Sequence, residues 1–299
     1  METKTLTVFT PAYNRAHTLP RTYESLHSQD CKDFIWLIVD DGSTDETAEL
    51  VKKWQETETE FEIQYIYKKN GGMHTAHNTA YENIHTELNT CIDSDDKMAP
   101  GAVSKILKTW DKHREEGYAG LIALDADFSG KIIGKEFPKE LYETTLGNYY
   151  ASGGSGDKKL IYRTDVIKSV PPYPVFQGEK YVGLVYKYTM VDQNYKLYVL
   201  NDVVCEVEYQ ADGSSNNMWN QYLTNPKGFA FLRKVNMEYP TSRKRLVMDC
   251  IHYCSSSQIA KNKNYIMESP RKCLTVLCTP AGRLLTAYIR KKAKQQNRR

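Results

Sequence analysis

Cys91-Ile92-Asp93-Ser94-Asp95-Asp96 places three carboxylates within four residues, directly after the apolar run at 88–92. A strand that ends in crowded acids is destabilised by repulsion unless a cation binds there, and hard divalent cations bind through carboxylates and phosphates. The stretch therefore indicates a site where a metal holds a phosphate-bearing ligand. The alternative is a solvated turn whose Asp residues cap a helix opening at Pro100-Gly101-Ala102, because Asp favours turns and helix N-caps.

Two earlier apolar stretches also end in polar residues. The β-like run at 6–10 leads into Pro11-Ala12-Tyr13-Asn14-Arg15, and the continuous apolar run at 34–39 leads into Asp40-Asp41-Gly42-Ser43. Such a continuous run is typical of a strand buried on both faces of a parallel sheet. Open α/β sheets bind ligands at the carboxyl ends of their strands. The three polar segments are therefore expected to converge on one crevice.

Helix patterns alternate with these strands. The spacing of Ser43-Thr44-Asp45-Glu46 is that of a capping box, and the helix that follows has an apolar side. Further helices are predicted at 17–29 and 75–85, with a strand at 61–67 and a turn at Gly71-Gly72. Strands and helices in strict alternation predict an α/β fold with an open sheet.

Composition excludes several classes of protein. With 299 residues, 40% of them hydrophobic and 26% charged, the chain is unlike a disordered or fibrous protein. It lacks a signal-like N-terminus and a run of ~18 apolar residues, so a cytoplasmic location is expected. The seven Cys are then reduced thiols. A zinc site is disfavoured because close Cys-x-x-Cys pairs are missing among Cys250, His252, Cys254, Cys273 and Cys278.

Basic residues are concentrated at the C-terminus. Segment 283–299 has seven basic and no acidic residues, which leaves 33 basic and 37 acidic residues, a net charge of −4, in the rest. Leu284, Leu285, Tyr288 and Ile289 are predicted to form one apolar stripe of a helix, a pattern typical of a helix on an anionic membrane surface. The alternative is a docked helix with a frayed basic end. Nucleic acid is not expected as a partner, because the rest of the chain offers no basic face.

The ordered motifs resemble glycosyltransferase family 2, in particular non-processive bacterial enzymes of polysaccharide synthesis. They are Thr10-Pro11-Ala12-Tyr13-Asn14-Arg15, Val39-Asp40-Asp41-Gly42-Ser43-Thr44-Asp45, Asn70-Gly71-Gly72 with Ala76 and Asn78, and Ile92-Asp93-Ser94-Asp95-Asp96. The resemblance implies a GT-A fold, a Rossmann-like open mixed sheet flanked by helices, here with a helical C-terminal extension. It also implies a nucleotide-sugar donor, most often a UDP sugar, and Mn²⁺ or Mg²⁺.

The same resemblance assigns roles to single residues. Pro11, Tyr13, Arg15 and Asp41 would hold the base and ribose, with Asp41 accepting a hydrogen bond from the uracil imide. Asp93 and Asp95 match the Asp-x-Asp motif that contacts the ribose and the metal-bound diphosphate. Asp96 is an additional candidate metal ligand, and the remaining candidate donor contacts are His74, Asn78 and Ser94.

One position departs from the family pattern. Many relatives have Lys or Arg after the Gly-Gly pair, whereas this chain has Met73 followed by His74. His74 and His77, one helical turn apart, are disfavoured as metal ligands because the site of a hard cation already has oxygen ligands.

The second half is expected to carry the acceptor chemistry. Relatives have an acid at the position of Glu179, at the start of a helix, as the general base that deprotonates the acceptor hydroxyl. The alternative for Glu179 is an acid stabilised by the helix dipole. The glycine-rich stretch 152–157 is interpreted as a flexible loop near a substrate, and 209–215 as a mobile lid.

The sequence thus predicts a metal-dependent, inverting glycosyltransferase that moves one sugar onto a growing cell-surface polysaccharide or a lipid-linked oligosaccharide. The predicted regions are a donor-binding half (1–97), an acceptor-binding and catalytic half (98–215) and a helical C-terminal region (216–299). Two alternatives stay open. A sugar nucleotidyltransferase would need a Gly-rich N-terminal loop followed by Lys, which is missing here. The other is a non-catalytic module that binds nucleotide sugars or docks on membranes.

Overall fold

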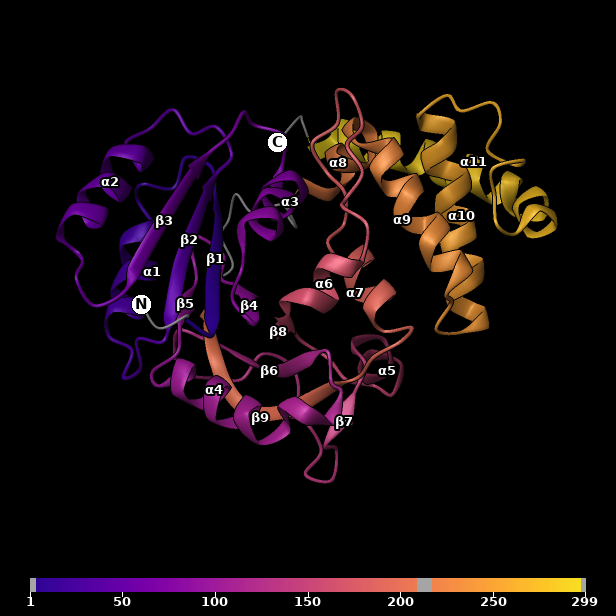
Figure 1. Cartoon of the computed structure of the whole chain (residues 1–299). Helices are drawn as coiled ribbons and strands as arrows, with labels where there is room; N and C mark the ends of the chain where they lie inside the picture. Colours follow the sequence, from indigo (N-terminus) through magenta and orange to yellow (C-terminus); the bar gives the residue numbers. More distant parts are fainter. Residues whose placement is uncertain (1–3, 209–216, 297–299) are drawn as a thin grey trace. The chain divides into compact units, whose positions relative to one another are not determined.

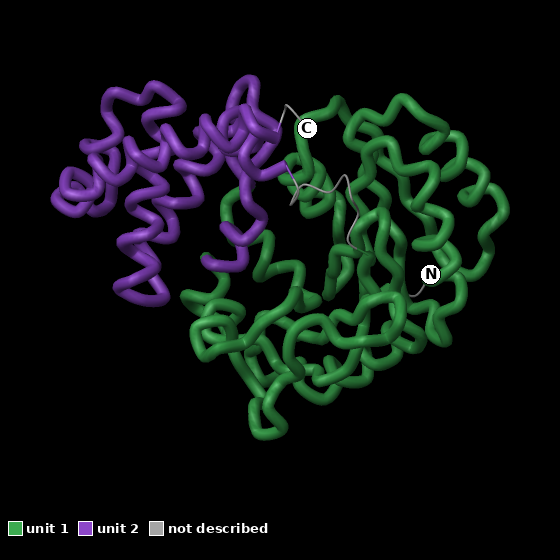
Figure 2. The backbone as a smooth tube through the Cα atoms, turned by 180° about the vertical axis from the view of Figure 1, so that it is seen from behind, with its two compact units in different colours: residues 1–172, 190–208 green, residues 173–189, 209–299 purple. Residues whose placement is uncertain are grey.

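The computed structural model describes residues 4–208 and 217–296 (Figure 1). The chain divides into two compact units (Figure 2). Unit 1 comprises residues 1–172 and 190–208, and unit 2 comprises residues 173–189 and 209–299. The predicted boundary at 97/98 falls inside unit 1. The three-region division from sequence stays a prediction.

Unit 1 is built on a nine-stranded sheet in the order β3-β2-β1-β4-β8-β6-β9-β5, with β7 paired to β9. β1 is parallel to both β2 and β4, and β2 is parallel to β3, whereas β8 is antiparallel to β4 and β6. This confirms the expected open mixed sheet. The strands are β1 (Leu6–Ala12), β2 (Phe34–Asp40), β3 (Glu62–Tyr67), β4 (Leu88–Cys91), β5 (Lys97–Met98), β6 (Gly120–Asp127), β7 (Glu143–Thr144), β8 (Lys158–Arg163) and β9 (Leu197–Val207).

Helices of unit 1 connect these strands and pack on the sheet. They are α1 (Leu19–His27), α2 (Thr47–Thr57), α3 (Met73–Asn83), α4 (Ala102–His113), the 3₁₀ turn η1 (Arg114–Glu116), α5 (Leu146–Ala151) and α6 (Thr164–Ser169). The alternation predicted up to residue 96 is therefore confirmed. Trp36 and Trp110 are fully buried members of the apolar core that the sheet shares with its helices.

The capping box predicted at 43–46 is wrong. Helix α2 begins at Thr47, and its N-cap Glu46 makes no side-chain capping bond. Ser43 Oγ instead accepts a hydrogen bond from the backbone N–H of Asn14 at 2.9 Å. The hydroxyl thus joins the loop after β1 to the loop after β2, a contact between distant segments that spacing along the chain does not reveal.

Unit 2 is helical. Its helices are α8 (Met218–Thr224), α9 (Pro226–Glu238), α10 (Arg243–Ile259) and α11 (Lys272–Gln296), and α7 (Val185–Val191) begins in this unit. The interruptions predicted at 225–228 and 269–270 coincide with the α8–α9 junction and with the α10–α11 connection. The helical C-terminal extension is therefore confirmed. Within the described ranges, no helix has the length and apolar character needed to cross a membrane.

The cysteines of unit 2 do not gather into a metal site among the described residues. Cys250, Cys254 and Cys278 are buried in the apolar core between α10 and α11, whereas Cys273 is exposed. The three buried thiols behave as small apolar side chains, as expected of reduced cysteines.

The apolar stripe predicted on the last helix is wrong in part. Ile289 is 2% exposed and Leu285 is half-buried, whereas Leu284 and Tyr288 are exposed. The buried side of α11, to which Ile289 belongs, packs against α10 and α8. Sequence periodicity identified the helix but not the face that a neighbour covers.

Candidate active site

The three polar segments predicted to converge do lie at one edge of the sheet. Strands β2, β1 and β4 are adjacent and parallel, so their carboxyl ends meet there. Backbone hydrogen bonds continue past the strand ends, from Asp41 N–H to Ala12 O at 2.8 Å and from Ile92 N–H to Phe9 O at 3.0 Å. Gly42 permits a further close approach: its φ is +86°, and a Cβ there would lie 2.7 Å from Asn70 N.

Burial alternates along the acidic loop. Ser94 and Asp96 are buried, whereas Asp93 and Asp95 are only half-buried. Asp96 N–H donates to Asp93 O at 3.0 Å, which folds the loop into a turn. The carboxylates of Asp93 and Asp95 are therefore the accessible pair, as the Asp-x-Asp resemblance requires of cation and phosphate contacts.

Helix α1 holds this loop. Arg21 Nη2 donates to the carbonyl oxygen of Asp95, and Thr22 Oγ1 donates to that of Asp96 at 2.8 Å. The helix that follows the loop, α4, has Gly101 as its N-cap and no side-chain capping bond. The alternative interpretation of the acids as caps of that helix is therefore wrong.

The electrostatics of the loop favour a cation. Burial and the neighbouring charge of Asp93 raise the pKa of Asp95. Burial raises the pKa of Asp96 to about 7, although the nearby Lys159 opposes this shift. Raised carboxyl pKa values mean that the ionised loop is destabilised, which a bound divalent cation would relieve.

The loop supplies too few ligands to enclose a metal by itself. Among the described residues, only His27, Glu58 and Glu60 bring three candidate ligand atoms within 4.8 Å of one another. Asp93 and Asp95 are hard oxygen ligands, and Mg²⁺ in proteins is usually bound by one or two carboxylates together with substrate phosphates. The residues present therefore fit a metal that binds together with a diphosphate.

Lys159, which the sequence interpretation did not single out, lies beneath the acidic loop. Its Nζ donates to the carbonyl oxygen of Cys91 at 3.2 Å, at the end of β4. Burial lowers the pKa of this ammonium, but the surrounding Cys205, Asp125 and Asp96 reverse that effect and hold it well above its usual range. A charged residue at the start of an apolar strand was the signal available in the sequence.

Asp125 is a second residue missed from sequence. It lies on β6, where it pairs with Cys205 of β9, and it is 3% exposed. Its Oδ1 has no hydrogen-bond partner among the described residues, and burial raises the pKa of its carboxyl to about 6. Buried polar atoms without partners are rare in folded proteins and often mark functional sites.

Asp41 is held by the loop that follows β3. One oxygen accepts from Gly71 N–H at 2.9 Å and from Lys68 Nζ, and the other accepts from Gly72 N–H at 2.7 Å. A carboxylate offers about four acceptor sites. Three donors therefore leave room for one more, which fits the predicted bond from a base imide. Lys68 was not predicted, because its partner is 27 residues away.

His74 lies in the first turn of helix α3, near the Asp41 carboxylate. The side chain is 2% exposed, and neither ring nitrogen has a partner among the described residues. Burial lowers the pKa of His74 to about 4, with Asp41 opposing and Lys68 adding to the shift. The imidazole is therefore neutral at pH 7. In the loop that precedes α3, Asn70 Oδ1 is also buried without a partner among the described residues.

The other residues predicted to contact the donor differ in their exposure and in the contacts that hold them. Tyr13 is 48% exposed just beyond β1, while Pro11 is buried within that strand. Arg15 N–H donates to Thr47 Oγ1 at 3.1 Å, which fixes its backbone near the start of α2. Asn78 is half-buried on α3.

His77 does not join His74 in a metal site. Its ring is fully buried and meets Phe9 edge-on at 5.0 Å between centroids. Its Nε2 lies 3.7 Å from Cys91 Sγ. His77 is therefore a core residue between α3 and the sheet.

Glu179 lies in unit 2, in a loop that precedes α7. The expectation that it stands at the start of its own helix is wrong. Its carboxylate accepts from the backbone N–H groups of Lys227 and Gly228, each at 2.9 Å, at the first turn of α9. The favourable interaction with a helix N-terminus is present, but the helix lies 48 residues further along the chain. Its role as a base stays a prediction.

The glycine-rich stretch 152–157 packs closely against another loop. Gly156 has φ +78°, and a Cβ there would lie 2.2 Å from Ile133 O. Lys158 Nζ donates to both Ile133 O and Ser155 O at 3.1 Å. These contacts explain the glycine by close backbone approach rather than by flexibility. The lid predicted at 209–215 lies outside the described residues.

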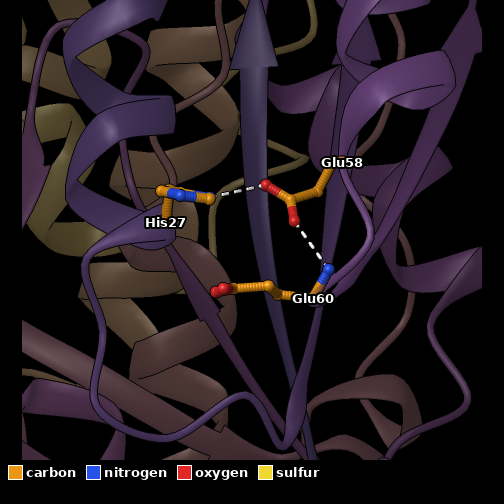
Figure 3. Close-up of side chains that lie close together, drawn as sticks. All are labelled: His27, Glu58 and Glu60. Atoms are coloured by element: carbon orange, nitrogen blue, oxygen red, sulfur yellow. Dashed lines mark hydrogen bonds and ion pairs between the residues drawn. The ribbon is translucent and has the colours of Figure 1, made fainter.

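A second cluster of potential ligands lies at the C-terminal ends of α1 and α2 (Figure 3). His27 Nδ1 lies 2.8 Å from Glu58 Oε2, which also accepts from Tyr23 OH at 2.9 Å. Glu60 N–H donates to the other oxygen of Glu58, and the Glu60 carboxylate pairs with Lys32 at 2.9 Å. Protein donors already satisfy these acids, so the cluster is an ion-pair network.

Comparison with known proteins places these features in context. The family model described as "Glycosyl transferase family 2" matches residues 7–164. The GalNAc(5)-diNAcBac-PP-undecaprenol beta-1,3-glucosyltransferase of Campylobacter jejuni is 29% identical over 171 residues, which cover 55% of this chain and 53% of that protein. The chain spans about half or less of the length of the curated relatives it matches first.

Solved structures share the fold. S. aureus TarS 1-349 in complex with UDP-GlcNAc is similar with a TM-score of 0.60, 17% identity and coverage of 96% of this chain and 92% of that chain. The mannosyltransferase PcManGT from Pyrobaculum calidifontis, in complex with GDP-Man and Mn²⁺, gives a TM-score of 0.57 at 16% identity, covering 98% of this chain and 84% of that one. The expected GT-A fold is confirmed.

Proposed function

The chain belongs to glycosyl transferase family 2, and we propose that it moves one sugar from a nucleotide sugar to a growing cell-surface polysaccharide or a lipid-linked oligosaccharide. The observation that carries this proposal is the shared edge of β1, β2 and β4. Asp41, His74 and the accessible pair Asp93 and Asp95 occupy the ends of these strands or the loops beside them. One edge thus offers both a base-reading carboxylate and a cation site.

The donor we propose is a UDP sugar. The remaining acceptor site on Asp41 suits the uracil imide N–H, and the unpaired ring nitrogens of His74 suit a polar group of the nucleotide. Tyr13 and Arg15 would flank the base and ribose, with Pro11, Asn78 and Ser94 completing the contacts. Complexes of the similar folds with UDP-GlcNAc and GDP-Man support the nucleotide-sugar class.

We propose that Asp93 and Asp95 hold Mn²⁺ or Mg²⁺ together with the donor diphosphate. Such an ion acts as a Lewis acid that stabilises the negative charge on the leaving diphosphate. Asp96 belongs to the predicted ligand set, but its Oδ1 lies 3.3 Å from Glu208 N–H and its side chain is buried. Its contacts suit a support for the loop better than a ligand. The Mn²⁺ complex of the archaeal enzyme supports the use of a divalent ion.

We propose an inverting, single-displacement reaction with Glu179 as the general base. The acceptor hydroxyl must lose its proton as it attacks opposite the leaving diphosphate, and a carboxylate is a suitable proton acceptor. Both Glu179 oxygens accept backbone hydrogen bonds from the first turn of α9. These bonds hold the carboxylate in one orientation, and oxygen lone pairs that they leave unused can take up the proton.

The acceptor we favour is lipid-linked, and the location we propose is peripheral on the cytoplasmic face of the membrane. The name of the Campylobacter relative describes action on an undecaprenol-linked glycan. The basic segment 283–299 supports attraction to anionic lipid. Arg298 and Arg299 of that segment lie outside the described residues.

Product analysis with a panel of sugar nucleotides tests this proposal. A glycosyltransferase releases a nucleoside diphosphate, the alternative nucleotidyltransferase consumes pyrophosphate, and a non-catalytic module does neither. Thermal shift identifies the donor, since a ligand specific to the folded state stabilises it by RT ln(1 + [L]/Kd). The expected result is that one donor releases its nucleoside diphosphate in the presence of Mn²⁺ and that no donor does so in EDTA. Pyrophosphate consumption would overturn the proposal.

A further inference from the structure

Helix α11 is fixed on α10 by one of its sides. Its buried residues recur at the three- and four-residue spacing of a single helix face: Thr275, Cys278, Gly282, Thr286, Ile289 and Ala293. A Cβ at Gly282 would lie 2.5 Å from Cys254 Cβ on α10, so glycine is needed for this approach. Ser255 Oγ and Thr286 Oγ1 lie 2.9 Å apart. These contacts fix the rotation of α11 and determine which residues face outward.

The outward side of α11 carries an apolar ridge. Leu277 and Leu284 are 77% and 75% exposed, and Tyr288 is 48% exposed. Spacings of seven and four residues place the three side chains along one line of the helix. Exposed leucines are ordinary when single, but three aligned apolar residues on a helix that buries its other side give that helix an exposed apolar line.

Positive charge surrounds this ridge. The described part of α11 contains six basic residues and no acid. Arg283, Arg290, Lys291 and Lys294 are exposed, and none of the six forms an ion pair within the described chain. Basic residues beside an exposed apolar line give the composition of a helix that lies in the interface of an anionic bilayer.

An aromatic pair continues the ridge onto α8. Tyr288 meets Trp219 edge-on at 5.5 Å between centroids, and Lys292 Nζ lies 5.6 Å from the centre of the Tyr288 ring. Trp and Tyr are enriched where membrane meets water, because they present an apolar ring and a polar tip. The pair therefore adds interfacial anchors at one end of the basic surface.

We propose that the outward face of α11, formed by Leu277, Leu284 and Tyr288 with the surrounding basic residues, is a docking surface for an anionic lipid bilayer. The inference rests on the peripheral location proposed above and names the surface responsible. A second copy of the chain is the other occupant to consider. Pairing this face with itself would oppose two sets of six cations without a compensating acid. Phospholipid headgroups supply the missing negative charge.

Sedimentation of the full-length protein with vesicles tests the proposal. Phosphatidylcholine vesicles with and without phosphatidylglycerol are compared, and binding is expected only when the anionic lipid is present. The double variant Leu277→Ser, Leu284→Ser is expected to lower the vesicle partition coefficient by about tenfold or more, since it removes two Leu side chains from the interface. Replacement of Arg290, Lys291 and Lys294 by Gln is expected to lower it by about fivefold per charge and to remove most of its salt dependence.

A matched control uses two apolar residues of unit 2 outside α11 whose exposure is similar to that of Leu277 and Leu284. Val175 and Met267 are 67% and 69% exposed, and the double variant Val175→Ser, Met267→Ser should bind vesicles as the wild type does. An equal loss of binding in this control would overturn the assignment to α11. Absence of vesicle binding by the full-length protein would also overturn the proposal. α11 variants that change the oligomeric state but bind vesicles as the wild type does would overturn it too.

UDP-sugar hydrolysis without vesicles separates this proposal from the proposed function. The α11 variants are expected to hydrolyse the donor at the wild-type rate. They alter no residue of the donor edge, the shared edge of β1, β2 and β4 with the loops beside it. A wild-type protein that binds anionic vesicles but cleaves no sugar nucleotide would leave the docking surface standing and overturn the enzymatic proposal. Loss of donor hydrolysis in the Leu variants, with vesicle binding retained, would overturn the docking surface.

Discussion

The donor edge of unit 1 and Glu179 of unit 2 were singled out by the same family resemblance, yet their surroundings differ. At the donor edge, the side chains of His74 and Asn70 contain buried polar atoms without a partner among the described residues. Glu179 instead has backbone partners on both carboxylate oxygens. Leaving a buried polar group unpaired costs roughly 1–3 kcal/mol. Unit 1 therefore has polar groups that a ligand can satisfy, whereas Glu179 already stabilises the protein without one.

The first way to test this contrast is Asp95→Asn, with the largest expected effect. Loss of one carboxylate charge removes a proposed metal ligand, and we expect turnover to fall by about 10³-fold or more. UDP should no longer give a Mn²⁺-dependent rise in melting temperature. The control is Asp96→Asn, which should keep that rise because its side chain points inward. Equal losses in both variants would show that the two acids act alike.

The second test is Glu179→Gln. The amide keeps an oxygen that can accept from Lys227 N–H or Gly228 N–H, but it cannot take up the acceptor proton. Transfer should fall by about 10²-fold or more, while UDP affinity and the melting temperature stay near the wild-type values. Glu179→Ala serves as the comparison, because it also removes the capping contacts and should lower the free energy of unfolding by about 1 kcal/mol. Normal transfer by the Gln variant would leave Glu179 a purely structural residue.

The third test removes the cation beneath the acidic loop with Lys159→Met. Asp96 and Asp125 would then lose a compensating charge, and we expect the free energy of unfolding to fall by roughly 2–3 kcal/mol. Urea denaturation of the metal-free protein measures this change. Lys97→Met is the control at the same end of the sheet, since Lys97 faces Glu206 at 3.9 Å near the surface. A loss of similar size in both variants would show that Lys159 has no special role.

The fourth test compares His74, which is buried in unit 1, with His252, which is half-buried in unit 2. Burial lowers the pKa of both His74 and His252 to about 4, below the unfolded value of 6.5. The unfolded chain therefore binds more protons between these values, so stability is lost as pH falls through that window. From pH 7 to pH 5, each histidine should cost about 1–2 kcal/mol of stability.

Gln substitutions distinguish the two histidines. His74→Gln and His252→Gln should each flatten the acid side of the stability profile, measured by urea denaturation as a function of pH. Only His74→Gln should also weaken UDP binding, because His74 belongs to the donor edge. Equal UDP affinity in the two variants would contradict the proposed contact between His74 and the nucleotide.

The sequence predicted much of unit 1 because its signals are local. Apolar runs, glycine turns and strand-terminal acids identified the strands β1 to β4 and the edge where they end. Parallel neighbours must present their carboxyl ends together, so Asp41 and the pair Asp93 and Asp95 could be assigned to one site before any contact was known. The interruptions between the last helices were predicted for the same reason.

Only the tertiary structure decided which side chains meet. The turn of the acidic loop directs Asp96 inward, and Lys159 reaches Cys91 O from a strand 68 residues away. The backbone N–H of Asn14 donates a hydrogen bond to the Ser43 hydroxyl, and the Glu179 carboxylate caps a helix that begins at Pro226. Pattern and spacing describe neighbours along the chain. Hydrogen bonds, burial and charge compensation depend instead on neighbours in space, and these are fixed when the sheet and helices pack.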